Sequence, residues 1–336
     1  MVRIGIVGIG FMGMIHYLAA QRLQGKAQVT ALCTRDPKKR AGDWTGIRGN
    51  FGPQGTQMDL GRVQVYGELE EMLADPELDL IDVCLPTHLH TPVVVQALQA
   101  GKHVLVEKPI ALTEADAGQM VQAAREARRL LMVAHVLPFF PEFRFAYDFV
   151  RSGRGGKVLA AHFQRIISKP DWSADIADHA KTGGPVVDLH IHDTHFIRLL
   201  LGQPSGVQAC GVQEGGSVQH LSTLYIYPKP GPNVTCISGA ICQKGRAFMH
   251  GYEIYLEKAT LLYQSGTQPL TILHADGRSE QPVLTGGDDA INAFAAELTE
   301  AVTGVETGKE PELLSGVLAR DALTLCRQEE AAVLRA

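Results

Sequence analysis

A lysine stands at the end of an apolar run, in the order Glu107-Lys108-Pro109 directly after His103–Val106. If that run is a strand of a parallel sheet, Lys108 emerges at the carboxyl edge of the sheet, where open α/β folds bind ligands. Pro109 restricts Lys108 to extended backbone and can adopt the cis form, which fixes the direction of the side chain. A lysine so placed can bind a substrate hydroxyl and carry its proton. The alternative is a surface lysine at a strand end.

A second group of reactive side chains crowds eight positions and consists of Asp188, His190, His192, Asp193 and His195. On a helix, Asp188 and His192 share one face, so both can address one substrate carbon. His190 and His192 would point about 200° apart, which leaves His190 for packing or hydrogen bonding. His192 and His195, three positions apart, keep a metal site open as an alternative. We expect no metal ion here.

A glycine-rich turn, Gly8-Ile9-Gly10-Phe11-Met12-Gly13, follows the first apolar run at once and opens a helical pattern. In that context Gly8 allows a tight turn, Gly10 lets backbone approach a pyrophosphate, and Gly13 permits close packing of helix on strand. The amide groups at the helix start, from Gly10 to Met12, would face the phosphate charge. The turn therefore predicts a bound dinucleotide, against the alternative of a purely structural turn.

The residues that follow the second apolar run bear on which dinucleotide is bound. An acidic residue there favours NAD and a nearby arginine favours NADP. The run ends Cys33-Thr34-Arg35-Asp36, so Thr34 takes the expected acidic position and Arg35 is placed to pair with a 2′-phosphate. Asp36 can instead cap a helix that starts at Pro37. The pattern favours NADP over NAD.

Further candidates for the cofactor edge follow the fourth apolar run. We expect Pro86, Thr87 and His90 to border the nicotinamide together with Glu107 and Lys108, and a plain loop role is the alternative for Thr87 and His90. Weaker candidates for contact with substrate are His162, Gln164, Arg165, Trp172, His179 and Lys181.

The elements that must position these residues fall into two stretches. Up to about residue 134, short apolar runs alternate with helical patterns such as Met14–Leu23, Glu68–Leu73 and Pro92–Ala100. Repeated strand–helix units of this kind indicate a doubly wound parallel sheet, here a Rossmann domain over residues 1–134. The predicted strands are Val2–Val7, Val29–Cys33, Val63–Tyr66, Leu80–Leu85, His103–Val106 and Leu130–Val133.

From residue 135 to 336 strands follow one another closely and two helices close the chain, at Asp288–Val302 and about Ser315–Val333. This predicts an α+β domain with a large, mainly antiparallel open sheet. The last helices of the chain can pack back on the first domain. The predicted strands are Val158–Ile167, Val207–Val212, Ser222–Tyr227, Val234–Cys242, Gly251–Leu256, Ala259–Tyr263 and Leu270–His274.

Composition narrows the class of protein. The formal net charge is −5 and 20% of residues are charged, which argues against a nucleic-acid or membrane-surface partner. No apolar run approaches the roughly 20 residues of a membrane span. The chain begins on a strand without the pattern of a signal peptide, and its six cysteines show no CxxC spacing, so we expect a cytoplasmic protein with reduced thiols.

These motifs together resemble the Gfo/Idh/MocA oxidoreductase family over most of the chain. The resemblance rests on the glycine turn and on four further segments: Asp79–His90, Ala100–Pro109, Gly183–Asp193 and Phe196–Gly202. It implies a Rossmann domain joined to a C-terminal domain whose open sheet often mediates dimers or tetramers. It also implies oxidation or reduction of a sugar, inositol or related polyol with NAD or NADP and without a metal.

The resemblance also implies roles for three residues. Lys108 matches the lysine of the family's Glu-Lys-Pro signature, and Asp188 and His192 match its Asp-x-x-x-His pair. His192 would then exchange the hydroxyl proton, Lys108 would polarise the oxygen, and Asp188 would orient substrate or partner. Spacing alone does not decide whether lysine or histidine is the base.

Three features depart from the family pattern. His195 stands where many members carry Asp, Pro138 stands where many carry Arg, and residues 41–61 form a glycine-rich excursion longer than the usual link. They suggest an unusual substrate, or a retained fold without activity. The excursion is either an ordered flap or a mobile loop.

Two other functions remain open from the sequence. One is a lyase or glycosidase that uses tightly bound NAD transiently, and the other is a dinucleotide-binding sensor without catalysis. The presence of Lys108, Asp188 and His192 argues against the sensor, since sensing alone does not need them.

Overall fold

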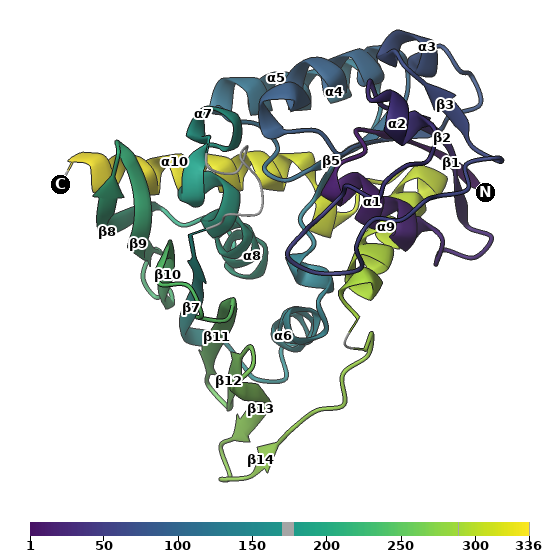
Figure 1. Ribbon diagram of the computed structural model, residues 1–336. Coiled ribbons are helices and arrows are strands. Elements are labelled where there is room, and N and C mark those ends of the chain that lie inside the picture. Colours follow the sequence, from purple (N-terminus) through teal and green to yellow (C-terminus); the bar gives the residue numbers. More distant parts are fainter. Residues whose placement is uncertain (170–177, 288, 336) are drawn as a thin grey trace. The chain divides into compact units, whose positions relative to one another are not determined.

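The computed structural model describes residues 1–169, 178–287 and 289–335 (Figure 1). The chain forms two compact units, Met1–Phe139 with Asp288–Arg320 and Phe140–Gly287 with Asp321–Ala336. The division falls within the last helix, α10 (Gly316–Arg335). The domain boundary expected between residues 134 and 135 stays a prediction.

The first unit contains a parallel sheet of six strands in the order β3-β2-β1-β4-β5-β6. This is the doubly wound sheet that the sequence predicts. All residues of β4 and β6 are buried, as expected for strands covered on both faces. The strands are β1 (Val2–Val7), β2 (Ala27–Cys33), β3 (Gln64–Tyr66), β4 (Leu80–Val83), β5 (His103–Glu107) and β6 (Leu131–Ala134).

Helices connect and cover these strands. The first opens within the glycine turn at Phe11, three residues before the predicted start at Met14, and α9 packs against it. Asp289 caps α9, and the predicted start of that helix at Asp288 lies outside the described residues. The helices of this unit are α1 (Phe11–Ala20), α2 (Pro37–Arg40), α3 (Leu69–Leu73), η1 (Thr87–Leu89), α4 (His90–Gln99), α5 (Glu114–Ala127), η2 (Leu137–Phe139), α9 (Ala290–Thr307) and η4 (Glu312–Leu314).

The excursion over residues 41–61 folds back on the first unit. Trp44 is fully buried, donates from Nε1 to the carbonyl oxygen of Lys39 at 3.1 Å, and packs edge-on against Tyr17. A short antiparallel bridge joins Asp43 to Gln57. Of the two forms expected, the structure therefore shows the ordered one.

The second unit contains a sheet of eight strands in the order β14-β13-β12-β11-β7-β10-β9-β8. Its described strand pairs are antiparallel except β7–β10, which confirms the mainly antiparallel sheet. The strands are β7 (Val158–Ser168), β8 (Gly206–Glu214), β9 (Ser217–Ile226), β10 (Asn233–Cys242), β11 (Met249–Leu256), β12 (Ala259–Gln264), β13 (Gln268–His274) and β14 (Ser279–Glu280).

Helices α6 (Pro141–Arg151) and α8 (Ile191–Leu201) of the second unit lie along one face of this sheet (Figure 1). The unit also contains α7 (His179–Thr182), the π-helical turn η3 (Val186–His190) and the second half of α10. Phe143 of α6 packs edge-on against Phe196 of α8 and Tyr252 of β11, with ring centroids 5.2 and 5.3 Å apart. These buried rings form the centre of the core of the unit. None of the helices in the described part of the chain is long and apolar enough to cross a membrane.

Candidate functional site

The glycine turn has the geometry that the sequence predicts. Gly8 has a φ of +94°, and a Cβ on it would lie 2.7 Å from the carbonyl oxygen of Cys84. A Cβ on Gly13 would lie 2.0 Å from the carbonyl oxygen of Gly8. Both positions therefore require glycine, one for its left-handed backbone and the other for close approach of helix to strand.

Gly10 differs from its two neighbours in the turn. It has extended backbone at the N-cap of α1, and among the described residues a Cβ on it would meet no atom within 4 Å apart from its chain neighbours. Protein packing therefore gives no reason for glycine here. A ligand that approaches the backbone at the helix start does give one, and the helix dipole favours an anionic group there. The turn fits the pyrophosphate of a dinucleotide.

An aromatic stack beside the turn was missed from the sequence. Phe51 of the excursion packs edge-on against Phe11 at 4.8 Å between centroids and stacks on Phe294 of α9 at 5.5 Å. The side chain of Phe11 is therefore occupied by packing, which leaves its backbone amide as the group for the predicted cofactor contact. Phe51 is an aromatic residue inside a glycine-rich loop, and this is the sequence signal from which the packing could have been predicted.

The end of β2 carries the residues expected at the ribose. Arg35 is exposed and Thr34 is half-buried, with its amide 3.2 Å from the carbonyl oxygen of Tyr66. Asp36 caps α2 by accepting from the amide of Lys38 at 2.9 Å, as its alternative role predicted. The guanidinium of Arg40 donates to the carbonyl oxygens of both Thr34 and Arg35 at 3.2 Å, which places a second cation at this strand end.

The end of β4 is tied to the turn that follows β5. His90 is fully buried, and its Nε2 lies 2.8 Å from the carbonyl oxygen of Leu85 while Nδ1 lies 3.0 Å from that of Pro109. Burial lowers the pKa of His90. Its side chain thus holds the two turns together, and direct contact of His90, Thr87 or exposed Pro86 with nicotinamide stays a prediction.

Lys108 follows β5 at the carboxyl edge of the sheet, as predicted, and is half-buried. Its amide donates to Oε2 of the buried Glu107 carboxylate at 3.0 Å. The Lys108–Pro109 peptide bond is cis, the form that the sequence allowed. The Glu-Lys-Pro segment is thus anchored through Glu107 rather than exposed as a simple surface turn.

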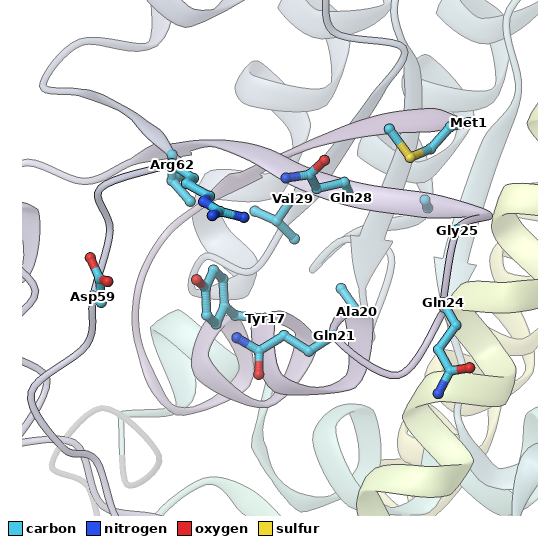
Figure 2. A pocket seen from close by; sticks show the side chains of 12 residues that line it. Met1, Tyr17, Ala20, Gln21, Gln24, Gly25, Gln28, Val29, Asp59 and Arg62 are labelled. Carbon is cyan, nitrogen blue, oxygen red and sulfur yellow. The ribbon is translucent and has the colours of Figure 1, made fainter.

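A cavity of about 430 Å³ lies elsewhere on the first unit (Figure 2). Met1, Ala27 and Gln28 line it from the amino ends of β1 and β2, and Tyr17 lines it from the second half of α1. The glycine turn and Lys108 lie at the carboxyl ends of their strands, which is the opposite edge of the sheet. This cavity is therefore separate from the predicted cofactor edge.

The polar segment of the second unit separates into exposed and buried members. Asp188, within η3, and His192, in the first turn of α8, are both partly accessible to solvent. His190, Asp193 and His195 are fully buried. The helix begins as a wider π-helical turn, a form often found at functional sites, rather than as the regular α-helix assumed from the spacing.

Each buried member is accommodated inside the unit. His190 Nδ1 lies 2.8 Å from Ser238 Oγ and its Nε2 lies 2.6 Å from Glu329 Oε2, which bears out the expected hydrogen-bonding role. Asp193 forms a two-point ion pair with Arg165 at 2.7 and 3.1 Å. Burial, with a smaller effect of Arg198, lowers the pKa of His195 to about 3. Asp193 and His195 are thus parts of the core of the unit, and the metal alternative gains no support from them.

Three of the weaker candidates for substrate contact bind other side chains of the second unit. Arg165 is buried and pairs with Asp193, and His162 Nδ1 lies 2.9 Å from Thr235 Oγ1. Gln164 donates to Gln264, and His179 and Lys181 lie in α7. Trp172 lies outside the described residues.

Family comparisons cover both units. Residues 2–135 match the oxidoreductase family with a NAD-binding Rossmann fold, and residues 143–262 match the Gfo/Idh/MocA C-terminal domain.

Named relatives show lower but extended similarity. The 1,5-anhydro-D-fructose reductase of Ensifer adhaerens is 29% identical over 72% of this chain and 74% of its own length. The myo-inositol 2-dehydrogenase of Thermotoga maritima is 26% identical over 60% of this chain, and the match spans just over half, 55%, of that protein. A levoglucosan dehydrogenase in complex with NADH and levoglucosan shares the fold, with a TM-score of 0.83 and 19% identity over 99% of this chain and 97% of that one.

Proposed function

Since the chain belongs to the Gfo/Idh/MocA family of oxidoreductases, we propose that it transfers a hydride between a nicotinamide dinucleotide and the hydroxyl or carbonyl carbon of a sugar, inositol or related polyol. The observation that carries the proposal is the glycine turn. Gly8 and Gly13 are required by backbone geometry and close packing, whereas Gly10 leaves the helix start open to a ligand. The relatives act on an anhydrosugar and an inositol, which supports the substrate class.

Three side chains would serve this reaction. The ammonium of Lys108 donates a hydrogen bond to the reacting oxygen and stabilises negative charge on it. In the oxidative direction, the imidazole of His192 or the amine of Lys108 accepts the hydroxyl proton, and imidazole exchanges protons readily near neutral pH. Asp188 orients substrate or the neighbouring imidazole. In the reductive direction the same groups return the proton to oxygen.

We further propose that the cofactor is NADP. Thr34 carries no negative charge that would repel a 2′-phosphate, and the exposed Arg35 is available to pair with one. Arg40 adds a second guanidinium, fixed on the carbonyl oxygens of Thr34 and Arg35. The family match describes a NAD-binding fold and does not distinguish NADP from NAD. The proposed preference for NADP therefore rests on the residues at the end of β2.

The two other functions considered from the sequence are not favoured. The relatives described above are named as a reductase and dehydrogenases, which supports net oxidation or reduction. A purely sensory role lacks a specific observation in its favour.

A second copy of the chain is the partner that we propose for the open sheet face. Ile226, Tyr255 and Leu273 are 38–40% exposed. The strand register places them in one row across β9, β10, β7, β11, β12 and β13. Apolar side chains gathered on a half-exposed sheet face are typical of an interaction surface. The sheet would then form dimers or tetramers.

The function is tested by fluorescence titration of the purified protein with NADPH and NADH, followed by a panel of sugars, inositols and anhydrosugars with the cofactor that binds. We expect saturable binding, tighter for NADPH, and consumption of cofactor with at least one polyol or its ketone. Saturable binding without any turnover across the panel in either direction would reject the proposed reaction. Absence of binding to either cofactor would reject the interpretation of the glycine turn.

A further inference from the structure

Five side chains that the proposed reaction does not use directly form a buried polar cluster in the first unit. They are His16 of α1, Asp82 of β4, Cys84, Glu107 of β5 and Glu297 of α9. His16, Asp82 and Glu297 are fully buried, and Glu107 is 6% exposed. Burying three carboxyl groups together is unfavourable unless they are paired or neutral. The partners that compensate each of these charges therefore indicate the role of the cluster.

His16 bridges two of the carboxylates. Its Nδ1 lies 2.8 Å from Asp82 Oδ2, and its Nε2 lies 3.0 Å from Glu107 Oε1. Both ring nitrogens thus face carboxyl oxygens, an arrangement that favours a proton on each nitrogen and a positive charge on the ring. Burial lowers the pKa of His16, but Asp82 and Cys84 together outweigh this effect, so the pKa is raised well above its ordinary value. One cation thus lies between two anions.

The bridge continues to the proposed catalytic lysine. The oxygen of Glu107 that does not face His16, Oε2, accepts from the amide of Lys108 at 3.0 Å. Asp82, His16, Glu107 and the backbone of Lys108 are therefore linked in series, by hydrogen bonds at the two ends and by the ion-pair contact of His16 Nε2 with Glu107 in the middle. Cys84 joins at its far end by donating to Asp82 Oδ1 at 3.6 Å.

We propose that His16 is a positioning residue for Lys108. By bridging Asp82 and Glu107 it fixes the carboxylate that holds the Lys108 amide, and so aims the lysine side chain at the carboxyl edge of the sheet. This inference rests on the proposed function for the role of Lys108. Removing His16 would leave Asp82 and Glu107 without a shared cation, so Glu107 would turn or bind a proton and release the Lys108 amide.

Glu297 supplies a matched control inside the same cluster. Both of its carboxyl oxygens are buried, and neither has a hydrogen-bond partner among the described residues. Burial raises the pKa of Glu297 well above its ordinary value, so the group is neutral. Glu297→Gln therefore replaces one neutral side chain by another of similar shape. Phe294, on the same helix, packs its ring against His16 at 5.9 Å between centroids and stays in place.

The test is a double-mutant cycle of His16→Gln and Glu107→Gln, with Glu297→Gln as control. For each variant kcat, KM, the Kd of the cofactor and the unfolding free energy are measured. We expect His16→Gln to lower kcat by roughly tenfold or more, because a displacement of about 1 Å can cost about 10²-fold in rate. Cofactor Kd should stay within about threefold, and the double variant should be no slower than the slower single variant.

Independent effects of the two substitutions on kcat would overturn the proposal. So would an equal loss in Glu297→Gln, or a loss of cofactor binding in step with stability, since either result indicates general damage to the core.

A second measurement uses the wild-type protein and needs no substrate. In ¹⁵N NMR of protein labelled at its 13 histidines, the His16 ring should carry protons on both nitrogens at neutral pH. Hydrogen exchange at the Lys108 amide should be slow. A neutral His16 ring would overturn the proposal. So would binding of added Zn²⁺ by His16 together with Asp82 and Cys84, whose ligand atoms lie close together. Because these signals are independent of turnover, they distinguish failure of the positioning role from failure of the proposed function.

Discussion

Substitution of Gly10 by alanine separates cofactor binding from folding more cleanly than any other change in the turn. In the part of the chain that the structure describes, the added Cβ meets no atom within 4 Å apart from its chain neighbours, and the backbone there is extended, so alanine fits without strain. At a helix N-cap the change from glycine to alanine should alter stability by less than about 1 kcal/mol. A dinucleotide phosphate that approaches this backbone would, however, meet the new methyl group.

The expected loss of affinity follows from the interaction that the methyl group disrupts. A hydrogen bond from a backbone amide to a charged group contributes about 1.5–3 kcal/mol. Since about 1.4 kcal/mol corresponds to a tenfold change in Kd, Gly10→Ala should weaken NADPH binding by roughly 10- to 100-fold. The assay is fluorescence titration with NADPH, together with urea unfolding of the same samples.

Two other glycines serve as controls for this prediction. Gly118, in α5, also has no atom of the described residues within 4 Å of an added Cβ, so Gly118→Ala should leave affinity unchanged and raise the unfolding free energy by up to about 1 kcal/mol through helix propensity. Gly13→Ala should destabilise the protein because its Cβ would lie 2.0 Å from the carbonyl oxygen of Gly8. Unchanged NADPH affinity in a folded Gly10→Ala variant would refute the reasoning, since the open space would then serve no ligand.

Other substitutions test the remaining parts of the account. Lys108→Ala and His192→Ala should each reduce kcat by about 10²-fold or more while cofactor Kd stays within about threefold, as measured by steady-state kinetics and titration. Arg35→Ala should raise the Kd of NADPH by roughly tenfold and that of NADH by less than about twofold, because only NADPH carries the 2′-phosphate. Tyr255→Lys should dissociate the proposed oligomer in size-exclusion chromatography with light scattering. Burial and, to a smaller extent, Arg198 lower the pKa of His195 to about 3. Between about pH 3 and 6.5 the unfolded chain therefore binds a proton that the folded chain does not bind. Stability should therefore fall as pH decreases through this range, and His195→Leu should flatten the slope by up to about 1.4 kcal/mol per pH unit in urea unfolding.

Controls and opposing results accompany these predictions. Lys38→Ala, an exposed cation in the neighbouring helix, should leave the preference for NADPH unchanged, and equal effects of Lys38 and Arg35 would reject specific pairing. Val283→Lys, at a 95% exposed apolar residue outside the strands, should keep the wild-type mass. A wild-type monomer would reject the sheet interface. Near-native turnover after loss of Lys108 or His192 would remove that residue from its role, and an unchanged pH slope would reject the protonation argument for His195.

Local patterns predicted those parts of the fold that depend on neighbouring residues. The glycine turn, the first sheet and the cap at Asp36 all follow from short-range spacing, backbone sterics and capping, and each is present. The segment after Gly184 was expected to be α-helical, yet it starts with a π-helical turn. A single sequence does not show such a turn because it depends on how the helix packs.

Partners distant in the sequence could not be found in this way. His16 and Asp82 are 66 positions apart, and only the arrangement of α1 against β4 brings them together. Asp193 looked like a possible metal ligand and Arg165 like a possible substrate contact, but they pair with each other inside the second unit. The excursion gave no sign of whether it was ordered until burial of Trp44 showed the answer. In each case long-range packing decides which side chains remain available for chemistry.

The most direct test of hydride transfer follows the hydride itself. Reduced cofactor deuterated at nicotinamide C4 would be incubated with the protein and the ketone of whichever polyol the panel identifies, and the product analysed by mass spectrometry. The account predicts that product formed by the wild-type protein carries one deuterium on the new carbinol carbon. Product without deuterium from either C4 position of the cofactor would show that its hydrogen comes from solvent, and would contradict the proposed reaction.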